Sequence, residues 1–196
     1  MTEVEKLYRE MDAFFARLWP GENRPLVFGD GKADAPRLTL VGEAPGEREV
    51  IERRPFVGKA GKNLDEFLGM VGLDRADIYV TNVVKVRPTK PGKSGRVINR
   101  APDKEELMLF APWLKKELEL LKPGALVSLG NVPLRALTED EKITIGDVHG
   151  TWLTAKNGLP LYALYHPASI IYRRELKEVY TRDVLALASW LRARDN

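Results

Sequence analysis

Four short apolar runs, separated by helical patterns, constrain the fold of this chain more than any other feature. Each run is rich in aliphatic, β-branched or aromatic residues and ends near turn-forming or polar residues; the runs are 37–42, 77–84, 125–130 and 161–166. Strands that alternate with helices predict an α/β fold, in which helices cover both faces of a parallel sheet. In such folds the ligand crevice lies beyond the carboxyl ends of the strands. The residues that follow each run are therefore the first candidates for a functional site.

The segments between the runs carry apolar residues at the i, i+3, i+4 spacing of amphipathic helices. We expect helices at 61–72, 101–121, 132–139 and 176–195. Gly72 is a suitable C-cap, and Pro112 is expected to kink or divide the second of these helices. Residues 88–101 are expected to form a long loop, and residues 140–160 a hairpin or irregular strands around an Asn-Gly turn.

The composition predicts a single domain over residues 1–196. The chain is 44% hydrophobic and is long enough for one substantial core but short for two. It contains no run of about 18 apolar residues, which a membrane-spanning helix requires. The N-terminal segment is charged and amphipathic, without the apolar centre of a signal peptide. We therefore expect a monomeric, cytoplasmic protein that does not enter a membrane.

The chain has no cysteine and only two histidines, which excludes several kinds of site. Without thiols it can form neither disulfides nor thiolate metal sites, and it has no cysteine nucleophile. The HExxH, Walker, GxGxxG and GxSxG motifs are also absent. We expect no metal site and no cofactor.

A basic segment, KVRPTKPGKSGRVINR, occupies residues 85–100 and contains no acidic residue, although the net charge of the chain is only +3. Such a local excess of positive charge attracts polyanions such as nucleic acids. The alternative is a solvated surface loop without a partner. The candidate DNA contacts are Lys85, Arg87, Lys90, Lys93, Arg96 and Arg100.

Candidate site residues lie at the ends of three runs and in one turn. The Gly-Pro turn at 42–46 either binds an anion through its backbone N–H groups or is only a turn. The amide of Asn82 suits the hydrogen-bonding edge of a pyrimidine, or else it caps the next turn. His166 is either catalytic or structural. Phe56, in a Pro-Phe-Val-Gly turn, either fills the core or stacks on a base.

Seven motifs in a fixed order resemble one known family. They are GEAPGE, RPFVGKAG, YVTNVVKVRP, NRAPDKEE, LVSLG, VHGTW and YHPASII. Together they resemble the uracil-DNA glycosylase superfamily, most closely its family 4, the iron–sulfur uracil-DNA glycosylases. The resemblance extends from about residue 26 to the last helix. It implies a three-layer α/β/α domain with a central four-stranded parallel sheet, chemistry that needs no cofactor, and uracil-containing DNA as the partner.

The resemblance also implies roles for individual residues. Phe56 matches the aromatic residue that stacks on the flipped base, Asn82 matches the amide that reads uracil, and His166 matches the histidine that contacts uracil O2. Glu43 matches the acid that positions the attacking water, and Glu47 is a second candidate for that role. The remaining matched residues are Gly42, Ala44, Pro45 and Gly46 of the base pocket, Ile170 as the wedge, and Arg173 as a further DNA contact.

The chain departs from family 4 at the positions expected for the cluster cysteines, which hold Ala13, Ala16, Val86 and Leu109. We predict that apolar contacts replace the cluster, among Phe14, Phe15, Val86, Leu109 and Phe110. Further departures from the family pattern are Val50, Arg53, Ser169 and Tyr172.

The leading hypothesis is a cluster-free glycosylase that removes uracil, and by extension other deaminated bases, and leaves an abasic site. The alternative is a DNA-binding paralogue with weak or altered activity, which the differences at Val50, Arg53 and Ser169 suggest. Covalent capture of the substrate through His166 is disfavoured. The Arg-rich insertion expected before such a histidine is missing, and residues 161–165 are apolar.

Overall fold

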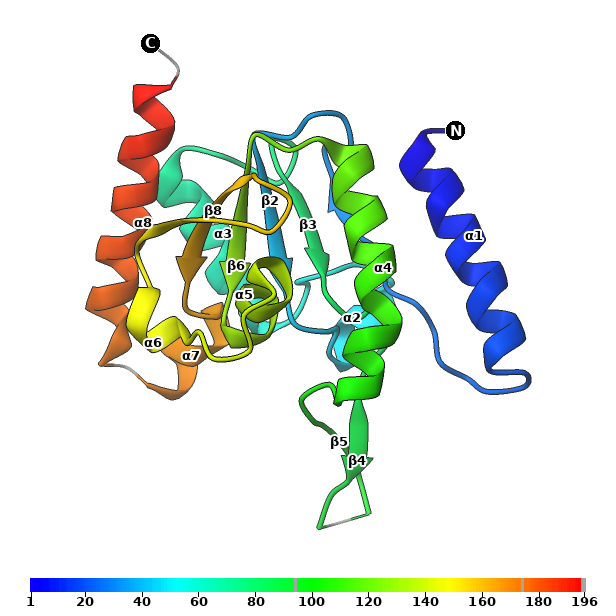
Figure 1. The fold of residues 1–196 in the computed structure, drawn as a ribbon. Coiled ribbons are helices and arrows are strands. Elements are labelled where there is room, and N and C mark those ends of the chain that lie inside the picture. The colour runs from blue at the N-terminus through cyan, green and yellow to red at the C-terminus, as the bar shows by residue number, and fades with distance from the viewer. Residues whose placement is uncertain (94, 174, 195–196) are drawn as a thin grey trace.

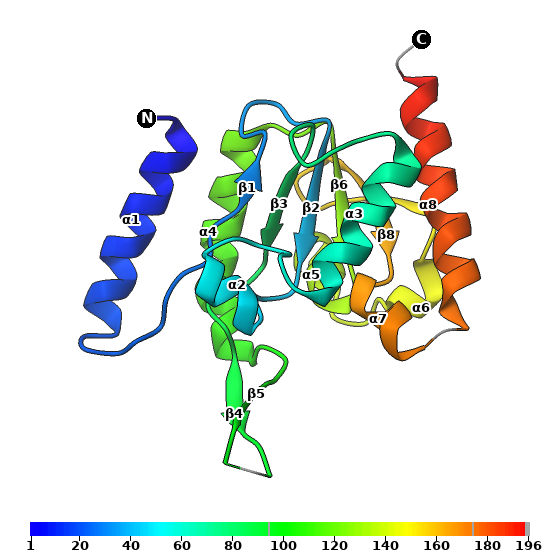
Figure 2. The same cartoon turned by 180° about the vertical axis from the view of Figure 1, so that it is seen from behind.

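The computed structural model describes residues 1–93, 95–173 and 175–194, and a six-stranded sheet forms its centre (Figures 1 and 2). Its four central strands are parallel and lie in the order β3 (Tyr79–Asn82), β2 (Leu38–Gly42), β6 (Ala125–Leu129) and β8 (Pro160–Leu164). Each of them overlaps one of the four apolar runs. The predicted α/β fold with a central four-stranded parallel sheet is confirmed.

Two short antiparallel strands extend this parallel core. β1 (Asp30–Gly31) pairs with β3, and β7 (Trp152–Thr154) pairs with β8. The chain turns between β7 and β8 at Asn157 and Gly158, where the Gly158 N–H donates to the Ala155 carbonyl over 2.9 Å. The hairpin expected within residues 140–160 is therefore present. β1 is too short to give a periodic signal, and it was not predicted.

Side chains of the central strands alternate between the two faces of the sheet, and helices cover both faces. Leu126 of β6 packs into a core formed with α1 (Glu3–Leu18), α4 (Lys104–Leu121) and α5 (Asn131–Thr138). Val127, the next residue, packs into the opposite core. The helices of that opposite layer are α3 (Lys59–Val71) and α8 (Leu176–Ala193). The predicted three-layer arrangement is confirmed.

The predicted helices are largely correct in position. α3 ends at Gly72, which has the left-handed φ of 74° that favours glycine at a C-cap. α4 begins with a capping box between Asp103 and Glu106 and continues through Pro112. It is not divided, because the buried side chains of Phe110 and Leu114 anchor it on both sides of the proline. Residue 195 of the last predicted helix lies outside the described residues.

Three short helices complete the carboxyl end of the sheet. They are α2 (Glu47–Glu52), α6 (Ile145–Val148) and α7 (Pro167–Tyr172). None of the helices in the described ranges is long and apolar enough to cross a lipid bilayer.

Residues 88–101 form a hairpin instead of the predicted loop. β4 (Thr89–Pro91) and β5 (Val97–Asn99) pair antiparallel as a separate two-stranded sheet. The hairpin projects from the body of the molecule at the carboxyl end of the parallel strands (Figures 1 and 2). Strands of three residues carry almost no periodicity, which explains why the sequence did not reveal them.

Aromatic rings connect α1 with α4 in the region where family 4 holds its cluster. Phe15 stacks on Phe110 with ring centroids 4.6 Å apart, and Phe14 contacts Phe15 edge-on at 5.1 Å. Val86 is buried in the same core, and Leu109 packs against it. The predicted apolar replacement is present. A thiolate-bound cluster does not fit this chain, because it has no cysteine and its described residues include no group of three or more His, Cys, Asp or Glu side chains placed to hold a metal ion.

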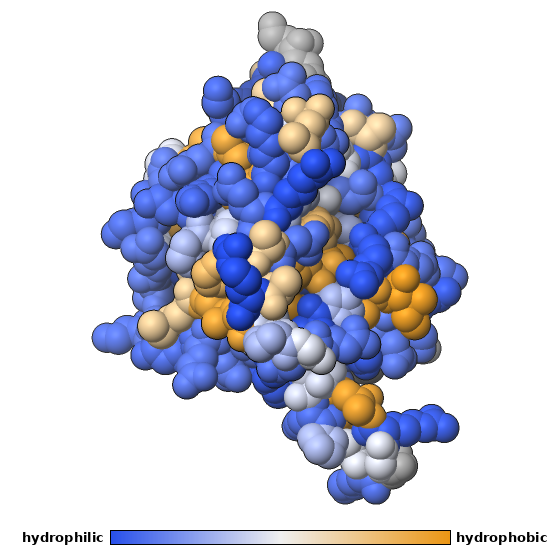
Figure 3. Space-filling view, turned by 90° about the vertical axis from the view of Figure 1, so that its right-hand side faces the viewer, coloured by the Kyte–Doolittle hydropathy of each residue, from blue (hydrophilic) through white to orange (hydrophobic). Residues whose placement is uncertain are grey.

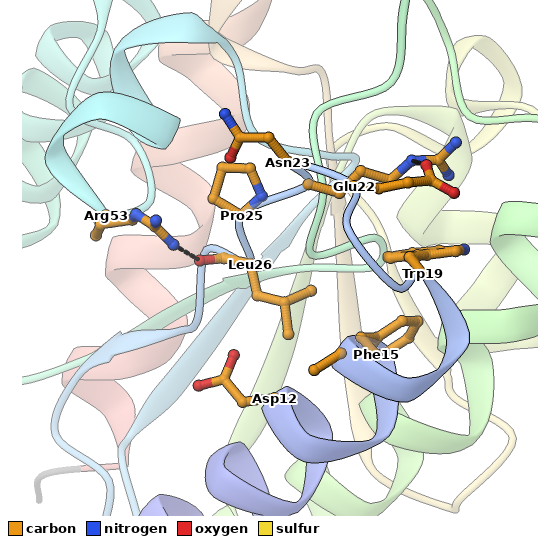
Figure 4. A pocket seen from close by; sticks show the side chains of 10 residues that line it. Asp12, Phe15, Trp19, Glu22, Asn23, Pro25, Leu26 and Arg53 are labelled. Atoms are coloured by element: carbon orange, nitrogen blue, oxygen red, sulfur yellow. Dashed lines mark hydrogen bonds and ion pairs between the residues drawn. The ribbon is translucent and has the colours of Figure 1, made fainter.

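Arg53, one of the departures from family 4, lies beside α1. Its guanidinium donates to the Leu26 carbonyl over 3.3 Å, at the edge of a cavity of about 210 Å³ that also contacts Asp12 and Trp19 (Figure 4). Arg53 follows α2 with a left-handed φ of 54°. It therefore ties α2 to the segment before β1 instead of lining a pocket at the end of the parallel strands.

Candidate active site

A cavity of about 330 Å³ lies at the carboxyl end of the sheet, within the size range of small-molecule sites. It brings together predicted residues from four parts of the chain, namely Ala44, Gly46, Glu47, Phe56, Asn82 and His166. The crossover connections of a parallel sheet deliver these residues to the same edge. Gly42, Glu43 and Pro45 do not line the cavity, and Pro45 is buried in the turn behind it.

Gly42 contributes to the site because it has no side chain. A Cβ atom at this position would lie 2.4 Å from Oδ1 of Asn82 and 2.6 Å from Cζ of Phe56. Gly42 and Asn82 are register partners in the parallel pairing of β2 and β3. The glycine therefore lets the amide and the aromatic ring approach the floor of the cavity together.

Phe56 has a left-handed backbone, with φ of 54°, which is costly for a residue with a side chain. Arg75 holds this conformation from one side. Its Nη2 donates to the Phe56 carbonyl over 2.5 Å and its Nη1 to the Pro55 carbonyl over 3.2 Å. Gly61 leaves room for the Phe56 carbonyl, since a Cβ there would lie only 1.9 Å from that oxygen. We call these contacts the Arg75 clamp.

Glu49, which was not among the predicted site residues, holds the same turn from the other side. Its Oε1 accepts hydrogen bonds from the N–H groups of Val57 at 3.1 Å and Gly58 at 2.8 Å. Glu49 also lines the cavity and interacts electrostatically with His166. A signal was present: a helix starting after Gly46 places Glu49 in its first turn, where acidic side chains are favoured.

Asn82 ends β3, and its side chain is almost fully buried, with the residue 2% exposed. Its carbonyl accepts a hydrogen bond from Nζ of Lys85 over 2.7 Å. The strand end that carries the amide is therefore fixed by the backbone pairing with β2 and by a buried ammonium group.

The prediction that Lys85 contacts DNA is wrong. Lys85 is fully buried, with Nζ 2.6 Å from Oε2 of Glu117 and 2.5 Å from the Thr81 hydroxyl. Burial lowers the pKa of Lys85, and the neighbouring Glu117 carboxylate opposes that shift. The Glu117 carboxylate also accepts hydrogen bonds from Thr81 and from Tyr8 of α1. The ion pair links the end of β3 to α4 inside the protein, since Glu117 lies on α4. The sequence did not reveal this pair, because its two residues are 32 positions apart.

His166 is the N-cap of α7, and this position defines its tautomer. Its Nδ1 accepts a hydrogen bond from the Ala168 N–H over 3.1 Å, so the proton of the neutral ring resides on Nε2. Burial lowers the pKa of His166 to about 4, against a smaller opposing effect of the Glu49 carboxylate. The imidazole is therefore neutral at physiological pH and presents one N–H donor. Its ring centroid lies 5.8 Å from that of Phe56.

The two acids predicted to position water differ in their surroundings. Burial raises the pKa of Glu43, and its carboxylate has no hydrogen-bond partner among the described residues. Glu47 is 68% exposed, and its carboxylate lies 3.3 Å from Nη1 of Arg87. Val50, another departure from family 4, does not line the cavity.

The remaining predicted DNA contacts fall into two groups. Arg87 and Arg100 have protein partners: Arg87 bonds Asn99 over 2.7 Å, and Arg100 makes two bonds to the Glu106 carboxylate, of 2.6 and 2.8 Å. Arg100 fastens the base of the hairpin to α4, so the prediction that it contacts DNA loses its support. The exposed group consists of Lys90, Lys93, Arg96 and Arg173, and Ile170 is partly buried on α7.

The comparisons with known proteins agree with this fold. A family model described as the uracil DNA glycosylase superfamily matches residues 28–188. The chain is 37% identical to a type-4 uracil-DNA glycosylase of Archaeoglobus fulgidus over 161 residues, which cover 79% of this chain and 75% of that relative. It is 34% identical to a type-4 uracil-DNA glycosylase of Thermotoga maritima over 172 residues, covering 85% and 83% of the two chains. The chain therefore belongs to the uracil-DNA glycosylase superfamily.

A solved structure gives independent support for the fold. The crystal structure of wild-type SMUG2 of Pedobacter heparinus is similar to this structure, with a TM-score of 0.56 and a sequence identity of 17%. The alignment covers 99% of this chain and 86% of that protein. At this identity the similarity shows the architecture alone.

Proposed function

We propose that this protein is a DNA repair glycosylase that hydrolyses the N-glycosidic bond of uracil in DNA and leaves an abasic site. The observation that carries this proposal is the neutral His166, held with its proton on Nε2, in one cavity with the Asn82 amide and the Phe56 ring. An aromatic face, an amide and a single N–H donor are the groups that bind a flipped pyrimidine. The names of the type-4 relatives support uracil as the base.

The chemistry follows from these groups. The oxygen of a water molecule bonds to C1′ while the C1′–N1 bond breaks, and the uracil leaves with the electron pair of that bond. Negative charge develops on the base, and the Nε2–H group of His166 stabilises it at O2. The Asn82 amide pairs with O4 and N3, and the exocyclic amine of cytosine would leave these polar groups unpaired. None of these steps uses a cofactor.

We assign the positioning of the water to Glu43 in preference to Glu47. Glu43 does not line the base cavity itself, but it directly precedes Ala44, which does, and its carboxylate is unpaired among the described residues. Glu47, in contrast, is engaged by Arg87. A carboxylate can orient the water and accept its proton as the C1′–O bond forms. The raised pKa of Glu43 increases its basicity for that transfer.

The DNA lies across the carboxyl end of the sheet in this proposal. Lys90, Lys93, Arg96 and Arg173 contact phosphates, and Ile170 fills the gap left by the flipped base. The protein acts as a monomer in the cytoplasm.

The test uses single- and double-stranded oligonucleotides that contain uracil, hypoxanthine or xanthine, followed by alkaline cleavage of abasic sites. We expect strand breaks at uracil with and without EDTA, and a loss of at least about 100-fold in Asn82→Ala. Equal breakage by the wild type and by Asn82→Ala would refute the proposed function. Binding to DNA that weakens with salt, without strand breaks, would identify a DNA-binding paralogue instead.

A further inference from the structure

The β4–β5 hairpin exposes two large aliphatic side chains in a basic setting. Val97 is 56% exposed and Ile98 is 43% exposed, both on the three-residue strand β5. The hairpin also carries Lys90, Lys93 and Arg96. No acidic residue occurs between Asp77 and Asp103, a stretch that includes the whole hairpin. Figure 3 shows the resulting hydrophobic atoms among hydrophilic ones on the projection at the foot of the molecule.

The base of this hairpin is fixed to the body of the protein. The Arg100 guanidinium bonds the Glu106 carboxylate of α4 and the Thr89 carbonyl of β4, the latter over 3.1 Å. Nε of Arg87 donates to the side chain of Asn99, at the end of β5, over 2.7 Å. A two-stranded hairpin alone is marginally stable in water. These bonds therefore hold its direction while leaving its apolar side chains without a core to pack in.

The exposed pair lies close to the base cavity along the chain. Asn99 lines that cavity. Val97, two residues earlier on β5, lies on the same face of the strand at a distance of about 7 Å, whereas Ile98 faces the opposite side. This distance is similar to two base steps of a DNA strand, which rises about 3.4 Å per nucleotide. The proposed wedge Ile170 belongs to α7, whose residue Ala168 also lines the cavity. Two separate elements that line the cavity, β5 and α7, therefore each carry an apolar side chain within two residues of the lining residue.

We propose that Val97, which lies on the same face of β5 as Asn99, enters the base stack of duplex DNA beside the flipped nucleotide as a second wedge, while Lys90, Lys93 and Arg96 contact the flanking phosphates. This inference rests on the proposed function. Flipping a base leaves a gap in the stack, and DNA-binding proteins fill or widen such gaps with aliphatic side chains. The basic residues around Val97 select a polyanion over an apolar protein partner as the occupant.

The wedge acts on the stacked duplex, so its removal should separate two substrates. The variant Val97→Thr keeps the β-branched shape and the strand propensity but replaces one methyl group with a hydroxyl. We expect kcat/KM for uracil in a duplex to fall about tenfold or more, and kcat/KM for uracil in a single strand to stay within about twofold. Leu185→Thr, on α8 and 47% exposed, is the matched control and should change neither value.

A second readout does not depend on catalysis. A duplex that carries 2-aminopurine next to a cleavage-resistant 2′-fluoro-2′-deoxyuridine becomes more fluorescent when the stack is opened, and the wild type should raise this signal more than Val97→Thr. Equal losses on duplex and single-stranded substrates, or an unchanged fluorescence increase in Val97→Thr, would overturn the second wedge. If the wild type cleaves no uracil, the proposed function fails, while the fluorescence comparison still decides whether the hairpin opens the stack.

Discussion

Removal of the Arg75 clamp should lower the activity without unfolding the protein. Phe56 adopts a left-handed backbone at φ of 54°, which costs a residue with a side chain about 1–2 kcal/mol. Arg75 stabilises it through bonds of 2.5 Å to the Phe56 carbonyl and 3.2 Å to the Pro55 carbonyl. The side chain of Arg75 is only 26% exposed, so that water replaces these bonds poorly.

The magnitude follows from that strain. In Arg75→Met the turn is free to relax by about 1–2 kcal/mol, which reduces the fraction of molecules with a correctly placed ring about 5- to 30-fold. We expect kcat/KM for uracil to fall by this factor on single-stranded and duplex DNA alike. Amide hydrogen exchange of residues 55–61 should accelerate by a similar factor. Arg75→Lys, which restores one donor, should recover part of the activity.

The control separates the clamp from a surface ion pair. Arg75 also bonds the Asp65 carboxylate over 2.7 Å, but Asp65 is 57% exposed, and such pairs contribute at most about 1 kcal/mol. Asp65→Asn leaves the carbonyl contacts in place and should change kcat/KM less than about twofold. Assays at 25 °C, with folding verified by circular dichroism, exclude global unfolding. Wild-type activity in Arg75→Met, or an equal loss in Asp65→Asn, would refute the reasoning.

Three further predictions follow from the described contacts. The pKa of His166 is about 4 in the folded protein and about 6.5 in the unfolded chain, so the unfolded chain binds more protons between pH 4 and pH 6.5. The free energy of unfolding should therefore rise with pH across that window. Melting curves should show a weaker rise in His166→Gln. Lys85→Met leaves the Glu117 carboxylate buried without its partner and should destabilise the protein by about 3–5 kcal/mol. In denaturant titrations, Lys85→Met/Glu117→Leu should recover most of this loss, and its DNA binding should keep the wild-type salt dependence. A slope of log K against log salt concentration that is lower by about one would instead show that Lys85 contacts a phosphate. Gly42→Ala places a methyl group 2.4 Å from Oδ1 of Asn82; it should lower kcat/KM about 100-fold and, by overpacking, destabilise the protein by about 1–3 kcal/mol. Full activity would show that the close packing is unnecessary.

The α/β fold could be predicted because its signals are local. The strands at 38–42 and 125–129 are buried along their whole length, and such continuous apolar runs are typical of parallel strands covered on both faces. The positions of Asn82 and His166 followed from the same runs, since parallel strands end at one edge. Phe56 was different: its turn could be read from the sequence, but its role came from the resemblance to known glycosylases.

Basic side chains were predicted less well, because the sequence gives their charge but not their partners. Lys85 and Lys90 belong to one basic segment, yet the first is fully buried against Glu117 and the second is exposed. Arg100 was counted with them, and it fastens the hairpin to α4 through Glu106. A long-range ion pair leaves no periodic mark on either of its two segments.

The sequence by itself determined the layered fold, the edge of the sheet where a site would form, and the absence of thiolate ligands, because strand periodicity and composition are properties of the chain alone. The tertiary structure decided which charges are free and which residues support the cavity. Glu49 and Arg75 reach the Phe56 turn from α2 and from the segment after α3. Their roles depend on directions in space between segments, and these are established only when the layers pack together.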